Sequence, residues 1–210
     1  MARILLADDH EIVRTGLRVF VNDIIEHSII DEVWNGDSLL EKVKENEYQL
    51  IILDVNMPGT DSFALVTNII IIQPGAKILM FSMNAEEIYA KKYLQLGVKG
   101  YVSKTATPAE LGEAINAVLK NERYISASLR QLLVDEVMDE KTKNPFDKLS
   151  SREFEIAQYL IRGESSAVIC NSLNLQSSTV GTYKARIFVK LKCKNIIELI
   201  QLAKIYNIIS

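Results

Sequence analysis

The first 121 residues alternate between two hydrophobic periods. Short apolar runs recur along this half, at residues 3–7, 28–33, 50–55, 76–82 and 100–104. Between these runs, apolar residues recur three or four positions apart, which is typical of helices with one buried face. Nearly continuous apolar strands that alternate with such helices predict a parallel sheet covered by helices on both faces. This half of the chain is therefore expected to form one α/β domain with five parallel strands.

After residue 121 the pattern becomes helical. A short helix is expected at residues 128–138, and the polar stretch 139–145, which ends in a proline, predicts a linker. The next helix begins at a capping box, Ser150 to Glu153, and stops at Gly163. Further helices are expected at residues 166–173, 178–192 and 196–206. Four short helices in about 60 residues are typical of a small DNA-binding or interaction module.

The charge of the chain differs between its two ends. Residues 1–121 carry 17 acidic and 11 basic side chains, which gives −6, and residues 149–210 carry 4 acidic and 8 basic side chains, which gives +4. The remaining residues contribute −1, so that the total is −3. An acidic first half and a basic second half indicate two domains with different partners, and the basic half suits a polyanion.

Cysteine and histidine are too scarce for several kinds of site. With two cysteines and two histidines, the chain supports neither a disulfide framework nor a zinc site rich in histidine. No apolar run approaches the roughly 18 residues that a membrane span needs. The expected location is therefore a reducing cytoplasm, without contact to a membrane.

Polar side chains follow four of the five predicted strands. They are Asp8, Asp9, Asp54, Ser82 and Lys104. Because the carboxyl ends of parallel strands meet at one edge of a sheet, these side chains should converge there. Three carboxylates at one place repel each other, and Mg²⁺, which prefers oxygen ligands, would relieve that repulsion. An ionised Asp54 can then attack a phosphoryl group, while Lys104 neutralises charge on the phosphoryl oxygens and Ser82 donates a hydrogen bond.

These residues, together with Tyr101 and the sequence LDVNMPG around Asp54, resemble the receiver domain of bacterial two-component response regulators. The resemblance implies a flavodoxin-like fold in which a sensor histidine kinase phosphorylates Asp54. It also implies that Ser82 and Tyr101 act as a switch. The implied Mg²⁺ ligands are Asp9, Asp54 and the backbone carbonyl of Asn56, with Asp8 assisting through water.

One position departs from many members of this family. They carry a proline after the lysine of the fifth strand, preceded by a cis peptide bond, whereas this chain has Lys104–Thr105. A cis bond before a residue other than proline costs roughly 3 kcal/mol, so the sequence leaves the geometry of this bond open.

The second domain resembles the LuxR-type helix-turn-helix of the NarL/FixJ regulators. The resemblance rests on LSSRE at residues 149–153, on Gly163, on Thr179–Val180, on Ile187 and on Lys190–Leu191. It implies a transcription regulator that dimerises, at least when phosphorylated, and that binds promoter DNA. The expected domains are a receiver at 1–121, a linker with a short helix at 122–146, and the DNA-binding domain at 147–210.

The helix at 178–192 is the one that should enter the major groove. The candidate DNA-binding residues are Ser178, Thr179, Gly181, Thr182, Lys184, Ala185, Arg186, Lys190 and Lys192. In relatives, the base contacts fall on the positions of Gly181, Thr182 and Ala185. Glycine and alanine have no side-chain donor for a base edge, so we expect few direct base contacts. The basic residues are interpreted as phosphate contacts, with specificity from dimer spacing and DNA shape.

There are four alternatives to this interpretation, and one of them, a regulator that works without phosphorylation, is disfavoured by the full acidic set. The apolar face of the last helix, with Ile196, Leu199 and Ile200, suits a dimer contact, but the whole face could also be core. The domain could be an interaction module that no longer reads DNA. Phosphatases of the haloacid dehalogenase type also use a strand-end aspartate with magnesium, but they place an acid–base aspartate two residues later, where this chain has Asn56. Turnover beyond self-phosphorylation from a phosphodonor and self-dephosphorylation is therefore not expected.

Overall fold

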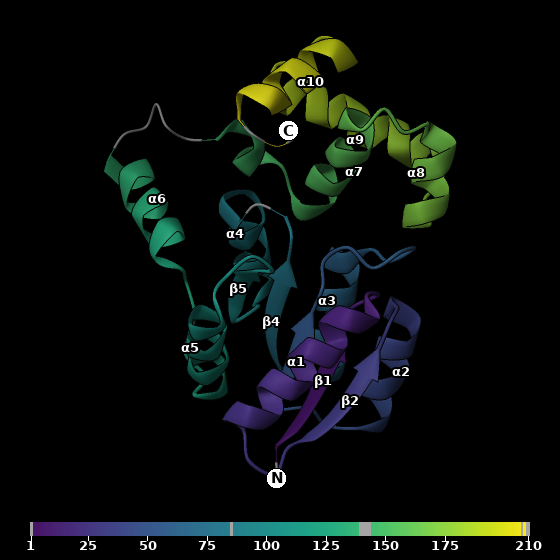
Figure 1. Ribbon diagram of the computed structural model, residues 1–210. Helices are drawn as coiled ribbons and strands as arrows, with labels where there is room; N and C mark the ends of the chain where they lie inside the picture. Colours follow the sequence, from purple (N-terminus) through teal and green to yellow (C-terminus); the bar gives the residue numbers. More distant parts are fainter. Residues whose placement is uncertain (1, 85, 139–143, 207, 209–210) are drawn as a thin grey trace. The chain divides into compact units, whose positions relative to one another are not determined.

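The computed structural model describes residues 2–84, 86–138, 144–206 and 208 (Figure 1). The chain divides into two compact units, Met1–Gln131 and Leu132–Ser210. This division lies within helix α6 (Ala127–Met138), which corresponds to the short helix expected at 128–138. Of the expected linker at 139–145, residues 139–143 lie outside the described part of the chain.

A five-stranded parallel sheet forms the centre of the first unit. Its strand order is β2-β1-β3-β4-β5, which confirms the flavodoxin-like, doubly wound fold. The strands are β1 (Arg3–Ala7), β2 (Ile29–Val33), β3 (Leu50–Leu53), β4 (Lys77–Ser82) and β5 (Gly100–Ser103). All four residues of β3 are buried, as a strand covered on both faces requires.

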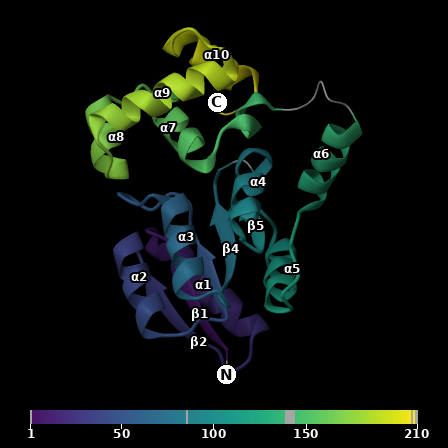
Figure 2. The same cartoon turned by 180° about the vertical axis from the view of Figure 1, so that it is seen from behind.

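Five helices cover the two faces of this sheet. They are α1 (Glu11–Ile24), α2 (Gly36–Glu45), α3 (Ser62–Ile72), α4 (Glu86–Leu96) and α5 (Pro108–Leu119). Leu17 of α1 and Ile115 of α5 belong to one apolar cluster that includes Ile52 of β3. Figure 1 shows α1 in front of the sheet, and Figure 2 shows α2 and α3 over the opposite face.

The isoleucine run at residues 69–72 forms the end of α3. Ile69 is fully buried, whereas Ile71 is 71% exposed, so one side of the helix end packs into the core and the other side faces solvent.

The second unit is helical. After a 3₁₀ turn at Pro145–Lys148, it contains α7 (Ser151–Ile161), α8 (Ser166–Leu173), α9 (Ser177–Leu191) and α10 (Ile196–Ile205). Ser150 and Glu153 form the predicted capping box at the start of α7. Gly163 ends this helix with φ +77°, a backbone conformation that glycine adopts without strain. The core includes Phe154, Ile187 and Leu199, each 0% exposed.

Candidate functional site

Asp54 lies at the exit of the buried strand β3. Its backbone N–H donates to the carbonyl of Ala7 at 2.8 Å, which continues the pairing of β3 with β1 by one residue. Its side chain accepts a hydrogen bond from the backbone N–H of Asn56 at 3.2 Å. Asp54 is only 3% exposed, so this carboxylate needs a partner of opposite charge.

Lys104 provides that partner. Its Nζ lies 2.8 Å from Oδ2 of Asp54 and 2.6 Å from Oδ2 of Asp8. Asp8 is 1% exposed, so one ammonium group is shared by two buried carboxylates that follow different strands, and its single charge offsets only one of their two negative charges. Because β1, β3 and β5 are parallel, their carboxyl ends bring these side chains together.

The charges of this cluster change the pKa values of two groups in it. Burial alone would lower the pKa of Lys104, but its bonds to Asp54 and Asp8 outweigh that effect and raise it, so the ammonium stays charged. Burial raises the pKa of Asp54, and the hydrogen bond from Lys104 opposes this rise without cancelling it. A further cation beside Asp54 would favour its ionised form.

The same edge of the sheet carries a group of oxygen and nitrogen atoms that could hold such a cation. Asp8, Asp9, His10 and Asp54 each offer one ligand atom, and these atoms lie within 4.8 Å of one another. Oδ1 of Asp9 is buried and accepts no hydrogen bond. The ring Nδ1 of His10 is 2.9 Å from it, but not in a geometry that makes a hydrogen bond. A buried oxygen without a hydrogen bond fits a hard cation, so these residues fit the magnesium site that the resemblance implies.

A second network connects Asp54 with the loop after β4. Asn56 and Asn84 exchange two side-chain hydrogen bonds, of 3.2 and 3.1 Å, and the backbone N–H of Asn84 donates to Oγ of Ser82 at 3.2 Å. The hydroxyl of Tyr101 donates to the carbonyl of Asn84 at 3.0 Å. Tyr101 is 1% exposed, so its ring points inward, and burial raises the pKa of its hydroxyl.

Sequence reasoning had singled out Asp8, Asp9, Asp54 and Lys104, and the structure brings them together. It had missed Asn84. No motif marks Asn84, because its role follows from a contact with a residue 28 positions away. The Lys104–Thr105 peptide bond, whose geometry the sequence left open, is trans.

The second unit places most of the candidate DNA-binding side chains on the exposed side of α9. Gly181, Thr182 and Ala185 are exposed, as are Lys184 and Arg186. On the opposite side, the buried residues of α9 are Val180, Ile187 and Leu191.

Lys190 differs from the other basic residues of this helix. Its Nζ lies 2.5 Å from Oε2 of Glu153, a buried residue of the α7 capping box. Lys190 therefore joins α9 to α7, an interaction that the sequence analysis did not foresee when it assigned this lysine to a DNA phosphate.

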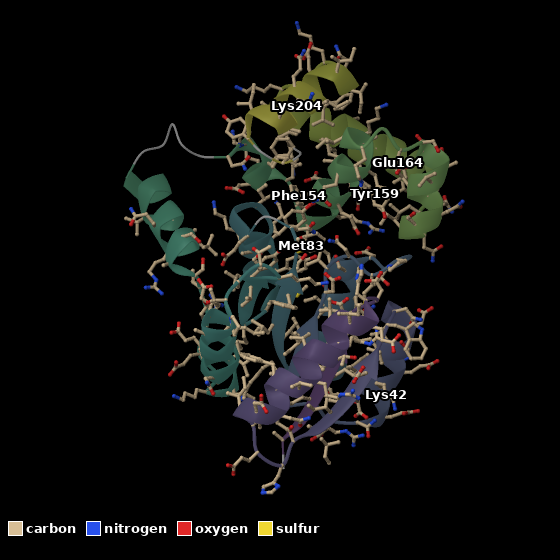
Figure 3. The ribbon with its side chains drawn as sticks, viewed as in Figure 1. Lys42, Met83, Phe154, Tyr159, Glu164 and Lys204 are labelled. Carbon is tan, nitrogen blue, oxygen red and sulfur yellow. The ribbon has the colours of Figure 1, made fainter. Side chains whose placement is uncertain are left out.

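One of the dimer residues expected on α10, Leu199, needs a correction, whereas Ile196 and Ile200 are half-buried. Leu199 is fully buried in the core of its own unit, so it is not available to a second copy of the chain. The exposed isoleucines of α10 are Ile197, at 64%, and Ile205, at 71%. Lys204 on the same helix, labelled in Figure 3, is exposed as well. The helical period places Leu199 toward the core and Ile197 two positions earlier toward solvent.

A doubly wound sheet with a lysine-bound aspartate at its carboxyl edge, followed by a helical unit with an exposed basic helix, defines a class of protein: the response regulators. Residues 4–116 match the response regulator receiver domain, and residues 147–203 match the bacterial regulatory proteins of the luxR family. The chain belongs to the two-component response regulators of the NarL/FixJ family.

Individual relatives share almost the whole length of the chain. The response regulator UvrY of Escherichia coli K12 is 33% identical over 204 residues, which cover 97% of this chain and 94% of UvrY. The response regulator GacA of Pseudomonas protegens is 33% identical over 203 residues, which cover 97% of this chain and 95% of GacA. Among solved structures, RcsB of Salmonella enterica serovar Typhimurium, bound to promoter P1flhDC in the presence of the phosphomimetic BeF3⁻, has a TM-score of 0.75. It is 25% identical, and the match covers 96% of this chain and 97% of RcsB.

None of the described helices is both long and apolar enough to span a membrane.

Proposed function

We propose that this transcription regulator binds promoter DNA in response to Mg²⁺-dependent phosphorylation of Asp54 by a sensor histidine kinase in the cytoplasm. Residues 1–121 would form the receiver and residues 147–210 the DNA-binding domain. The observation that carries the proposal is the buried Asp54 carboxylate, which Lys104 holds at 2.8 Å beside the carboxylates of Asp8 and Asp9.

The proposed reaction transfers a phosphoryl group to a carboxylate oxygen of Asp54. The new bond joins this oxygen to phosphorus, and the bond from phosphorus to a histidine nitrogen of the kinase breaks. The nitrogen leaves with its electron pair and takes up a proton. Lys104 already lies at the carboxylate, so its ammonium group is in place to neutralise a phosphoryl oxygen.

Magnesium would be held by Asp9, Asp54 and the backbone carbonyl of Asn56, with Asp8 assisting, and it would supply positive charge to the phosphoryl oxygens. The absence of an acid–base aspartate at Asn56 supports a stable aspartyl phosphate rather than a phosphatase cycle. The only enzymatic steps proposed are self-phosphorylation from a small donor and self-dephosphorylation.

The signal would reach the receiver surface through Ser82 and Tyr101. Both are bound to Asn84, which in turn is bound to Asn56 next to the phosphate acceptor. A phosphoryl group that draws Ser82 toward it would therefore pull on the loop that holds the hydroxyl of Tyr101. The expected consequence is homodimerisation and tighter binding to promoter DNA.

The test uses acetyl phosphate with Mg²⁺ as the donor and reads phosphoprotein and molecular mass together. We expect the wild type to be labelled and to shift toward a dimer. Asp54→Asn should remain unlabelled and monomeric, while Asp37→Asn, which changes an exposed carboxylate of α2, should behave as the wild type. Equal labelling of Asp54→Asn, or labelling that persists in excess EDTA, contradicts the proposal.

A further inference from the structure

The exposed side of α9 carries a strip of small and apolar groups. We call Ser178, Gly181, Thr182, Ala185 and Val189 the outer strip; all five are exposed, and Val189 is 78% exposed. Their spacing of three or four residues keeps them on one side of the helix. Val189 therefore adds an apolar group to the exposed side of the helix that is expected to bind DNA.

The outer strip offers almost no hydrogen-bond donors to a base edge. Gly181, Ala185 and Val189 have no polar side-chain atoms. The hydroxyl of Thr182 donates to the backbone carbonyl of Ser178 at 3.0 Å, one helical turn earlier. This bond commits the hydroxyl to the helix itself and leaves the methyl group as the part of Thr182 that is available to a ligand.

Two cations, Lys184 and Arg186, lie beside the strip, and the exposed Lys192, which caps the end of α9, follows Val189 on the same side. Lys184 and Arg186 each directly adjoin Ala185 in sequence, so they lie about 100° to either side of it around the helix. Lys190 is bound to Glu153, and Lys184 Nζ lies 5.7 Å from the centre of the Phe188 ring. Cations on both flanks suit the two phosphate backbones that border a DNA groove, which leaves the strip facing the bases between them.

We propose that α9 selects its DNA site by contact with thymine methyl groups in the major groove, through the methyl groups of Thr182, Ala185 and Val189. Among the groups that base pairs present there, the C5 methyl of thymine is the apolar one, and alanine and the methyl of threonine are partners suited to it. This inference rests on the proposed function, because it takes α9 to be the helix that enters the groove.

Gly181 supports such close contact. A Cβ atom built at this position meets no atom within 4 Å beyond its chain neighbours and the adjacent helix backbone, so no packing inside the protein requires a glycine there. Its missing side chain lets the helix backbone come nearer to the bases, as a contact through short methyl groups requires.

The experiment removes the methyl group from the DNA without changing base pairing. The full-length chain, treated with acetyl phosphate and Mg²⁺, selects duplexes from a random library. The selected duplex is then resynthesised with deoxyuridine in place of each thymidine in turn. We expect affinity to fall about fourfold at each of two or more thymines in a half-site, since a methyl group contributes about 0.8 kcal/mol when buried.

A matched pair of variants tests the protein side. Thr182→Val keeps the methyl group and the β-branched shape but loses the hydroxyl, so it should bind the selected duplex as the wild type does. Thr182→Ser keeps the hydroxyl and loses the methyl, so it should bind several-fold more weakly. At one of the thymidines, replacement by deoxyuridine should no longer weaken the binding of the Thr182→Ser variant. Val189→Thr, which is nearly isosteric, should weaken binding as well.

The outcomes separate this inference from the proposed function. If the chain selects a duplex but every uracil substitution changes affinity by less than twofold, or if Thr182→Val is the damaging member of the pair, thymine methyls are not read. Salt-dependent binding without any selected sequence also overturns the inference and leaves DNA binding itself intact. If no duplex is retained at low salt, the proposed function fails, and the inference with it.

Discussion

At the scale of single residues, the central feature is an ammonium group shared by two buried carboxylates. Removing one partner of a buried ion pair is far more costly than removing an exposed one, because the remaining charge stays without water. Asp8 and Asp54 are 1% and 3% exposed, so we expect Lys104 to stabilise the fold in addition to its role in the proposed reaction.

Lys104→Met should therefore lower the free energy of unfolding by about 2 kcal/mol in the presence of EDTA. Added Mg²⁺ should restore part of this loss, because a bound cation stabilises the folded state in place of the ammonium. Urea denaturation followed by circular dichroism measures both effects. Lys120→Met, at the exposed end of α5, is the control and should change neither quantity. A Lys104→Met variant as stable as the wild type would show that the two carboxylates do not depend on this lysine.

At the scale of elements, Glu153 joins two helices of the second unit. It accepts from the backbone N–H of Ser150 at 2.8 Å within the capping box of α7, and from Nζ of Lys190 of α9 at 2.5 Å. Burial alone would raise the pKa of Glu153, but Lys190 and Ser150 outweigh this and lower it below its ordinary value of 4.5.

Because the pKa of Glu153 is lowered in the folded state, the contribution of this residue to stability depends on pH in a defined direction. As pH falls below 4.5, the unfolded chain takes up the proton before the folded one does, so this contribution to stability is present above that pH. It is lost as pH falls through the lower pKa of the folded state.

Glu153→Gln keeps a capping residue but lacks the charge. It should be less stable by about 1–2 kcal/mol at pH 7, and its stability should fall less steeply in acid. Denaturation curves at pH 7, 5, 4 and 3 test this, and parallel curves for the two proteins would rule it out.

On α10, substitution of a buried leucine and substitution of an exposed isoleucine should affect stability differently. Leu199→Ala removes a fully buried side chain and should destabilise the second unit by about 2–5 kcal/mol. Ile197→Asp changes a residue that is 64% exposed, so stability should stay within about 0.5 kcal/mol. If α10 forms the dimer contact, this variant should remain monomeric after treatment with acetyl phosphate. Light scattering distinguishes the cases, and a full dimer of Ile197→Asp would place the contact elsewhere.

At the scale of the whole molecule, the two units divide the chemistry between them. The acidic first unit holds the proposed phosphate acceptor, and the net charge of +4 over residues 149–210 belongs to the unit that carries α9. Affinity for DNA should accordingly depend on salt, because each phosphate contact releases bound counterions.

Lys184→Ala and Arg186→Ala should each weaken DNA binding about equally for all sequences and reduce the slope of log K against log salt by about 1. Lys190→Ala should reduce this slope less, because its ammonium is bound to Glu153. Fluorescence anisotropy at several salt concentrations gives the slopes. A loss for Lys190→Ala as large as that for Arg186→Ala would mean that Lys190 leaves Glu153 when DNA binds.

Much of the fold could be predicted because it depends on local periodicity. Each predicted strand was found to within two residues, and the capping box at Ser150 marked the start of α7. The acidic pocket could be predicted as well, because parallel strands necessarily bring Asp8 and Asp54 to one edge of the sheet. Helical spacing likewise accounts for the position of Val180 and Ile187 on the buried side of α9.

The sequence by itself therefore determined the order of the elements, the acidic edge of the sheet and the exposed face of α9. Only the tertiary structure decided which side chains are already engaged. It bound Lys104 to a carboxylate 50 positions away, Lys190 to one 37 positions away and Asn56 to Asn84, and it placed Leu199 rather than Ile197 in the core. These outcomes depend on contacts between residues far apart in the chain. Neither the composition nor the local hydrophobic periodicity of the sequence specifies which residues form those contacts.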